Sequence, residues 1–276
     1  MLAAIAASFA TTTRTETVVA RNQIDNAAAR ALADAGFHRA VLALAAEGED
    51  LPRDSSPREW AFAGGRVVTS VQAEGGKVDL NGADADLLAG LFAAAGATNA
   101  RSLANAVVDF RDADDDPLPG GGEDADYRAA GLDHEAKDRP FERRDELLQV
   151  IGMTREIYDV VTPAITVYTR SRGIDPATAP ALALAALSRI GAGGGEAPAG
   201  QREARTLEDL RALHGDSPYV IPSKTPVITM RREPVVTIRS EATTPNGAVF
   251  VRESIVALTP GLRRPFHLLT WEQGRR

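Results

Sequence analysis

The sequence predicts an α+β protein in which a long N-terminal helix lies against an antiparallel sheet and a large α-helical domain is inserted into that sheet. Three observations support this prediction. The stretch Ala3–Ala46 is rich in alanine and contains no proline and only one glycine, Gly36, which favours a helix. Strand patterns occur from Trp60 to Leu80 and again from Val227 onward. Helical periodicity fills the residues between these regions, so a single interrupted sheet is the simplest arrangement.

The N-terminal helix is apolar at its start and amphipathic afterwards. Its first residues, Met1–Ala10, are almost all apolar, whereas a membrane span needs about twenty such residues. No basic residue precedes them, as one would in a secretory signal peptide. We therefore expect a truncated hydrophobic helix whose first half lies before this numbering, with one end projecting into a membrane or a partner.

Turn and capping signals define the remaining elements. Gly75–Gly76 predicts a hairpin turn, and Asn81 predicts the cap of the helix that follows. Helices are expected at Leu103–Phe110 and Thr154–Val161, and Pro245–Gly247 predicts a turn between two late strands. The predicted domains are 1–46 for the N-terminal helix, 47–80 and 216–276 for the sheet, and 81–215 for the inserted helical domain. Within the last, a surface loop is expected at 191–206 and a short helix at 206–214.

Composition excludes several classes of function. The formal net charge of -7 argues against a general binder of nucleic acid or anionic membranes. The chain has no cysteine, which excludes disulfides, thiolate metal sites and cysteine nucleophiles. None of its four histidines lies at a metal-ligand spacing such as HExxH or beside a nucleophile motif.

The most informative stretch is an acidic loop at residues 109–126. Proline and glycine at 117–122 exclude helix and strand there, so the loop bends back and brings two carboxylate clusters together. The acidic residues are Asp109, Asp112, Asp114, Asp115, Asp116, Glu123, Asp124 and Asp126. Carboxylates held close repel one another unless a cation lies between them, and oxygen ligands on a flexible loop suit calcium. The residues alone are equally compatible with a solvated acidic loop.

Two other functions are compatible with parts of the sequence. Val78–Asn81 and Ile174–Ala177 form a weak internal repeat at the start of helical stretches, which is typical of helix-hairpin-helix modules that bind nucleic acid. The acidic loop between the repeats would repel phosphate. Asp112 and Glu123 also have the residue types of a carboxylate hydrolase pair, although few aromatic residues flank them to hold a sugar.

Several motifs occur in a recognisable order along the chain. They are the helix from Arg14, the strand Gly76–Asn81, the segment Asp109–Asp114, Gly122–Glu123 with Tyr127, the segment Asp145–Thr154, and Trp271 near the end. In this order they resemble the general secretion pathway protein K family, the minor pseudopilins of the type II secretion system. Asp109–Asp114 is similar to the family's D-W-R-D-x-D motif, with Phe110 in place of the usual tryptophan.

The resemblance implies a pilin-like fold with a helical domain inserted into the sheet, and no enzymatic activity. Family members lie at the tip of the pseudopilus, where they initiate and cap the filament with the pathway's proteins I and J, so that folded proteins cross the outer membrane. They are made with a basic leader and held in the inner membrane by a single helix, with the soluble domain in the periplasm. The inner-membrane assembly platform is a further partner that the resemblance implies. The leader and the first half of the apolar helix would precede residue 1.

The resemblance also implies a calcium site in the acidic loop. The calcium ligands expected from matched motif positions are Asp112, Asp114, Glu123 and Asp124, with Asp116 and Asp126 as additional oxygen donors. Asp109 stands at a helix end, where we expect it to cap the helix or to pair with Arg111.

Overall fold

The computed structural model describes residues 2–45, 51–189, 235–259 and 265–275, with the side chains of the first helix described from residue 13. The chain divides into two compact units. The sheet unit comprises Met1–Gln72 and Val236–Arg276, and the inserted unit comprises Ala73–Val235. The loop expected at 191–206 and the helix expected at 206–214 lie outside the described residues.

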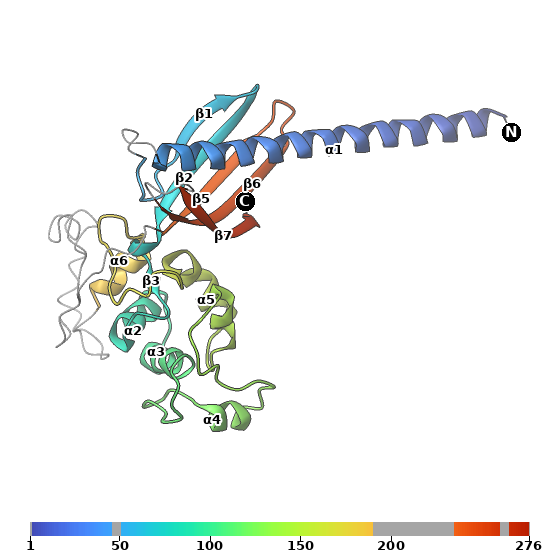
Figure 1. Ribbon diagram of the computed structural model, residues 1–276. Coiled ribbons are helices and arrows are strands. Elements are labelled where there is room, and N and C mark those ends of the chain that lie inside the picture. The colour runs from blue at the N-terminus through green and yellow to red at the C-terminus, as the bar shows by residue number, and fades with distance from the viewer. Residues whose placement is uncertain (1, 46–50, 190–234, 260–264, 276) are drawn as a thin grey trace, which may run out of the picture. The chain divides into compact units, whose positions relative to one another are not determined.

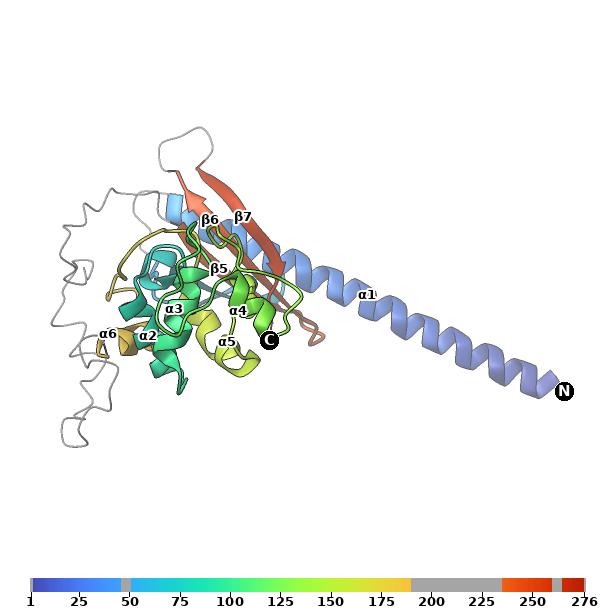
Figure 2. The same cartoon turned by 90° about the horizontal axis from the view of Figure 1, so that it is seen from below.

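A single helix, α1 (Leu2–Ala45), opens the chain, as the composition predicts. Its second half packs on the sheet through positions that recur every three or four residues, namely Ala29, Ala33, Phe37, Ala40 and Val41. Its first half extends past the sheet (Figures 1 and 2), and Val18 and Ile24 are exposed there. Within the residues that the structure describes, no helix combines the length and the apolar character needed to cross a membrane.

The sheet has five strands in the order β1-β2-β5-β6-β7. They are β1 (Arg58–Phe62), β2 (Gly65–Ala73), β5 (Val235–Thr243), β6 (Val249–Leu258) and β7 (Phe266–Gln273). β2 and β5 are neighbours although the inserted unit separates them in sequence. This continuity across the insertion confirms the predicted fold class, and the turn predicted at Pro245–Gly247 joins β5 to β6.

The first hairpin turn lies elsewhere than predicted. β1 and β2 pair antiparallel with Phe62 opposite Gly65, so the turn is Ala63–Gly64, with φ values of 48° and 80°. Gly75 and Gly76 instead lie in a short 3-10 helix, η1 (Glu74–Gly76). A two-residue turn with two positive φ values usually carries Asn-Gly or Asp-Gly, and alanine at its first position gives no such signal.

Phe37 and Gly36 set how closely α1 lies on the sheet. The Phe37 side chain is buried, and its ring meets Trp271 of β7 edge-on with centroids 4.9 Å apart. A side chain at Gly36 would overlap Ser240 of β5 and Val67 of β2. The missing Cβ therefore allows the helix backbone to approach two strands while the neighbouring aromatic ring fills the space beside it.

The inserted unit is mainly helical, as predicted. After η1 its elements are β3 (Val78–Asp79), α2 (Ala85–Ala94), α3 (Ala100–Asp109), α4 (Asp124–Ala129), η2 (Arg144–Gln149), α5 (Arg155–Val161), η3 (Thr162–Ala164), β4 (Ile165–Thr166) and α6 (Ala181–Leu187). α2 is central, because it packs against both α3 and α6. β3 lies in the stretch predicted as strand, but its short parallel pairing with β4 was not predicted.

Asp79 anchors the start of the inserted unit. Its buried carboxylate accepts hydrogen bonds from the main-chain N–H groups of Asn81, Gly82, Thr169 and Arg170 and from the Thr169 hydroxyl, at 2.8–3.1 Å. This one side chain therefore links two segments that are far apart in sequence.

The predicted capping role of Asn81 was wrong. The Asn81 amide donates to the carbonyl of Phe141, and its side-chain oxygen accepts from the Phe141 N–H at 2.7 Å. The cap of α2 is Asp84, whose carboxylate accepts from the Leu87 N–H at 2.9 Å. Both residues have side chains that suit a cap, but Asn81 lies too far ahead of the helix.

Candidate calcium-binding site

The acidic loop connects α3 to α4, and Asp109 at the end of α3 holds it in shape. The Asp109 carboxylate is buried and accepts hydrogen bonds from the N–H groups of Gly122 at 2.8 Å and Leu118 at 3.2 Å. Gly121 passes so close that any side chain there would overlap this carboxylate. Asp109 thus pins the far side of the loop against the helix, which is a structural role that the sequence did not reveal.

The ion pair between Arg111 and Asp109, which was one of the two roles expected for Asp109, does not form. The Arg111 guanidinium is largely buried and donates to the carbonyl oxygens of Leu80 and Ala83, at 2.6 Å for the latter. Burial lowers the pKa of Arg111, while the nearby carboxylates of Asp79 and Asp112 raise it. The side chain therefore fastens the base of the loop to the segment ahead of α2.

Three aromatic rings support the loop from inside the unit. Phe110 packs against Phe141 with centroids 5.1 Å apart and against Tyr127 with centroids 6.3 Å apart. Tyr127 is buried, and its hydroxyl accepts from the Ile151 N–H at 3.0 Å. Burial raises the pKa of Tyr127 to about 12, so it stays protonated. These contacts fix both ends of the acidic loop.

Asp112 and Glu123 have inward-facing oxygens without a partner. Asp112 Oδ1 and Glu123 Oε1 are buried and make no hydrogen bond within the described residues. Glu123 is only 5% exposed. Burial raises the pKa of Glu123 to about 7, and the charges of Asp109, Asp112, Asp138 and Asp115 add to the effect. Burial and the same kind of repulsion, chiefly from Asp114, raise the pKa of Asp112.

The other predicted ligands have mainly local contacts. The Asp114 carboxylate accepts from the Asp116 N–H at 3.2 Å, and both residues are exposed. Asp124 accepts from the Ala136 N–H at 3.2 Å, and Asp126 accepts from the Glu123 N–H at 3.0 Å. Asp126 thereby helps to start α4, and Asp124 holds the segment that returns toward the loop.

Asp138 also belongs to the group of carboxylates around Asp112 and Glu123, although it was not among the predicted ligands. Its carboxylate raises the pKa values of both Asp112 and Glu123, and burial and Asp124 raise its own. Asp138 has a φ of 51°, a left-handed conformation that aspartate adopts more readily than most residues. The sequence gives no motif at this position, so only the folding of the chain places it here.

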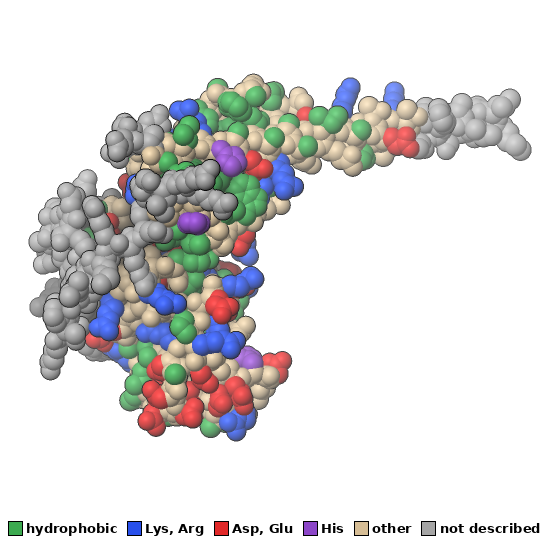
Figure 3. All heavy atoms as spheres, in the orientation of Figure 1, with side chains coloured by type: hydrophobic (Ala, Val, Ile, Leu, Met, Phe, Trp, Pro, Cys, Tyr) green, Lys and Arg blue, Asp and Glu red, His purple; other side chains and the backbone are tan. Residues whose placement is uncertain are grey.

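The acidic side chains gather at the end of the inserted unit that carries α4, and Figure 3 shows them as a red patch. As the side chains stand, the described residues contain no group of three or more His, Asp or Glu arranged to hold a metal ion. The two partnerless buried oxygens and the raised pKa values still mark a place that lacks positive charge. The ligand set remains a prediction.

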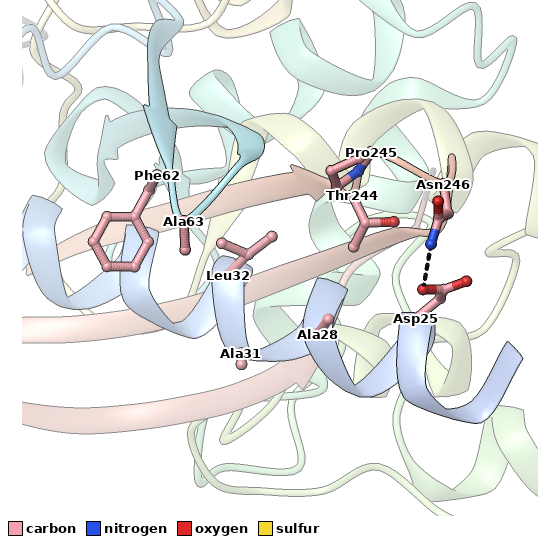
Figure 4. Close-up of a pocket in the computed structure, with 9 residues that line it drawn as sticks. All are labelled: Asp25, Ala28, Ala31, Leu32, Phe62, Ala63, Thr244, Pro245 and Asn246. Atoms are coloured by element: carbon pink, nitrogen blue, oxygen red, sulfur yellow. Dashed lines mark hydrogen bonds between the residues drawn. The ribbon is translucent and has the colours of Figure 1, made fainter. Parts of the chain in front are cut away.

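A separate apolar pocket of about 310 Å³ lies in the sheet unit. Its lining comes from α1, from the β1–β2 turn and from the β5–β6 turn; Figure 4 shows Leu32 and Phe62 along it and the hydrogen bond from Asn246 to Asp25 at one end. Neither Asp112 nor Glu123 lines this pocket. This pocket is therefore not the aromatic cleft that a carboxylate hydrolase would need beside Asp112 and Glu123.

Comparisons with known proteins give a consistent picture. Residues 68–170 match the model of a family described as type II secretion system (T2SS), protein K. No curated protein matches the chain. The fold is similar to that in the crystal structure of the GspK-GspI-GspJ complex from the enterotoxigenic Escherichia coli type 2 secretion system. That match has a TM-score of 0.58 at 17% identity and covers 96% of this chain and 99% of the other.

Proposed function

We propose that this chain, whose residues 68–170 match the model of the type II secretion system protein K family, is a minor pseudopilin at the tip of the pseudopilus. There it would initiate and cap filament assembly for the export of folded proteins across the outer membrane. This role is structural and needs no catalytic group. It agrees with the acidic composition, which disfavours the helix-hairpin-helix nucleic-acid alternative.

The family match to residues 68–170 is the observation that carries the proposal. The matched segment runs from β2 into the inserted unit and includes the acidic loop. An insertion of this size between two neighbouring strands gives the subunit a bulk that a simple stacking subunit does not have. A subunit of this kind would obstruct the addition of another above it, as a cap must.

The proposed partners are the two other minor pseudopilins of the same secretion system, the counterparts of GspI and GspJ. The relative of similar fold was solved in a complex named for these proteins. Before assembly the protein would be held in the inner membrane by its N-terminal helix, with the soluble domain in the periplasm. Mixing the purified chain with its I and J counterparts tests the proposal: a stable ternary complex by light scattering supports it, and three separate species would overturn it.

We also propose that the acidic loop binds calcium. Asp112 and Glu123 would supply the first oxygens, since each has a buried oxygen without a partner, and Asp114, Asp116, Asp124 and Asp126 are the further candidates. Bound calcium would supply the positive charge that this group of carboxylates lacks. Asp109 pins the loop and the aromatic rings hold both its ends, contacts that would keep such a site in shape.

Thermal unfolding with calcium and with a chelator tests this second proposal. At a free calcium concentration about a hundredfold above Kd, the stabilisation amounts to about 2.7 kcal/mol, so calcium should raise Tm and the chelator should reverse the rise. The double variant Asp112→Asn/Glu123→Gln should lose the response, whereas Glu16→Gln on the exposed part of α1 should keep it. An unchanged Tm under both conditions with the loop intact contradicts calcium binding.

A further inference from the structure

The two edges of the five-stranded sheet differ in how they are protected. β1 has five residues, of which Arg58 and Glu59 are charged, and Glu59 forms a two-point ion pair with Arg66 of β2 at 2.6 Å. Proteins generally use short length and charge to stop an edge strand from pairing with another chain. β1 has both features, which disfavour pairing of this edge with a further strand.

β7 lacks these protections. It has eight residues, contains no proline or lysine, and carries Glu272 as its only acidic residue. Leu268 and Leu269 are neighbours on it and are 48% and 44% exposed. No strand among the described residues lies beyond β7, which Figure 1 shows beside β6. Within the described parts of the chain, this edge therefore combines main-chain groups that no strand pairs with and exposed apolar side chains.

The pairing with β6 shows which main-chain groups of β7 point outward. Hydrogen-bonded and non-hydrogen-bonded pairs alternate along an antiparallel ladder. The Thr259 N–H donates to the Pro265 carbonyl at one end, and the Gly274 N–H donates to the Val251 carbonyl at the other. Counting inward from both ends of the β6–β7 ladder, the residues whose N–H and C=O groups point away from β6 are Phe266, Leu268, Trp271 and Gln273.

A bulge between these two halves does not close the edge. The register shifts between Ile255 and Val256, so Leu269 has no partner residue on β6. Bulges commonly blunt an edge strand. This one, however, leaves two adjacent leucines exposed, and the outward-directed groups continue on both sides of it.

We propose that the outer edge of β7 binds an extended strand of a partner pseudopilin of the tip complex. The inference rests on the proposed function and names the surface that the complex would use. A strand fits because it alone supplies alternating main-chain donors and acceptors for Leu268, Trp271 and Gln273. Its apolar side chains would cover Leu268 and Leu269.

Amide hydrogen exchange on the unmodified protein provides the first test. Mixing the chain with its I and J counterparts should slow exchange at the outward N–H groups of Leu268 and Trp271 by about tenfold or more, with no change at the matching edge residue Ala61 of β1. Exchange at Leu268 and Trp271 that is unaltered in a proven complex overturns the inference and leaves the proposed function intact. If no complex forms at all, it is the proposed function that fails.

Proline substitution provides the second test. Leu268→Pro removes an outward N–H that the β6–β7 ladder does not use, and it should weaken binding of the partners by about tenfold. Ala61→Pro is the matched control, because Ala61 pairs with Arg66 at a position that is also directed outward from its edge. It should leave binding unchanged. Equal losses for both variants would contradict the proposal.

A second variant and a measurement of oligomeric state complete the test. If Leu268→Pro lowers Tm, the double variant Leu268→Lys/Leu269→Glu replaces it, since it keeps every main-chain group and removes only the apolar cover. The oligomeric state of the chain alone is measured as well. Self-association that the Leu268 and Leu269 changes abolish would show that the edge takes a second copy of this chain, and would overturn the proposed partner.

Discussion

The Arg252 guanidinium of β6 donates to the Asp34 carboxylate of α1 at 2.8 Å, in the interface where the helix lies on the sheet. Arg252 is 3% exposed and also lies over the Trp271 ring, 4.3 Å from its centroid. Asp34 is partly open to solvent, with 31% of its side chain exposed. Arg252 also donates to the Glu272 carbonyl at 3.3 Å and lies over the Phe250 ring, but Asp34 is the carboxylate that its side chain contacts. Loss of that counter-charge should therefore weaken the packing of α1 on the sheet.

We expect Asp34→Ala to destabilise the sheet unit strongly, because it leaves the buried Arg252 without its counter-charge. Breaking such a pair costs about 3–5 kcal/mol when fully buried, and partial exposure of Asp34 lowers the expected cost toward about 2–3 kcal/mol. Glu59→Ala is the matched control, since its ion pair with Arg66 is exposed and should be worth under about 1 kcal/mol. Urea denaturation measures both, and equal losses would contradict this account.

Gly36→Ala should destabilise the protein although alanine is the better helix former. The added Cβ would overlap Ser240 and Val67, and such overpacking costs about 1–3 kcal/mol, more than the ~1 kcal/mol gained in helix propensity at most sites. Gly75→Ala is the comparison, because a Cβ there meets nothing within 4 Å. A thermal melt in which Gly36→Ala is as stable as the parent would show that α1 can move away from the sheet at little cost.

The stability of the calcium-free protein should fall as pH rises from about 4.5 to about 7. The pKa of Glu123 is raised from 4.5 to about 7 in the folded chain, so in this window the folded state holds a proton that the unfolded state has released. Stability then decreases with pH, and Glu123→Gln should remove that component of the slope. The measurement is Tm across the pH range in chelator, and a rise attributable to Glu123 would contradict the assignment.

Calcium should alter this pH dependence if it binds beside Glu123. Binding to the carboxylate form displaces the proton, so calorimetric titrations near pH 6 should show proton release that depends on the ionisation enthalpy of the buffer. The same titration near pH 8 should show none from this group. Binding without proton release at the lower pH would place the ion away from Glu123.

Asp79→Asn should destabilise the start of the inserted unit more than the nearby substitution Asp84→Asn does. The amide keeps one acceptor oxygen and presents a donor toward N–H groups that now face a carboxylate, which leaves buried donors unpaired at about 1–3 kcal/mol each. Asp84→Asn is the control, because asparagine caps a helix as well as aspartate does. Denaturant midpoints that fall equally in both variants would contradict the special role of Asp79.

The strongest local patterns predicted the fold well. The proline-free stretch gave α1 almost to the residue, and helical spacing located α3 and α5. The first turn was missed because Ala63 adopts a positive φ without the residue type that usually signals it. The parallel pairing of β3 with β4 was missed because the two residues of β4 carry no periodicity.

The sequence predicted the acidic loop but not the three-dimensional arrangement of its side chains. The sequence identified the acidic stretch, yet it could not assign Asp109 to the loop's main-chain N–H groups or bring Asp138 beside Glu123. Both placements depend on tertiary folding, which brings together segments that are distant in sequence. Carboxylates that look alike in sequence therefore divide into those that build the loop and those left with a partnerless buried oxygen.

The adjacency of β2 and β5 has a consequence for the order in which the chain folds. The segment Ala73–Val235 separates β2 from β5 in sequence, so the two strands pair only when the loop formed by this whole segment closes. Closing so long a loop from an unfolded chain is slow and entropically costly. If the described part of the inserted unit folds first, it shortens the loop that remains to be closed, so we expect sheet completion to be the late kinetic step. Its rate would then depend on Asp79 and the acidic loop, which lie outside the sheet altogether.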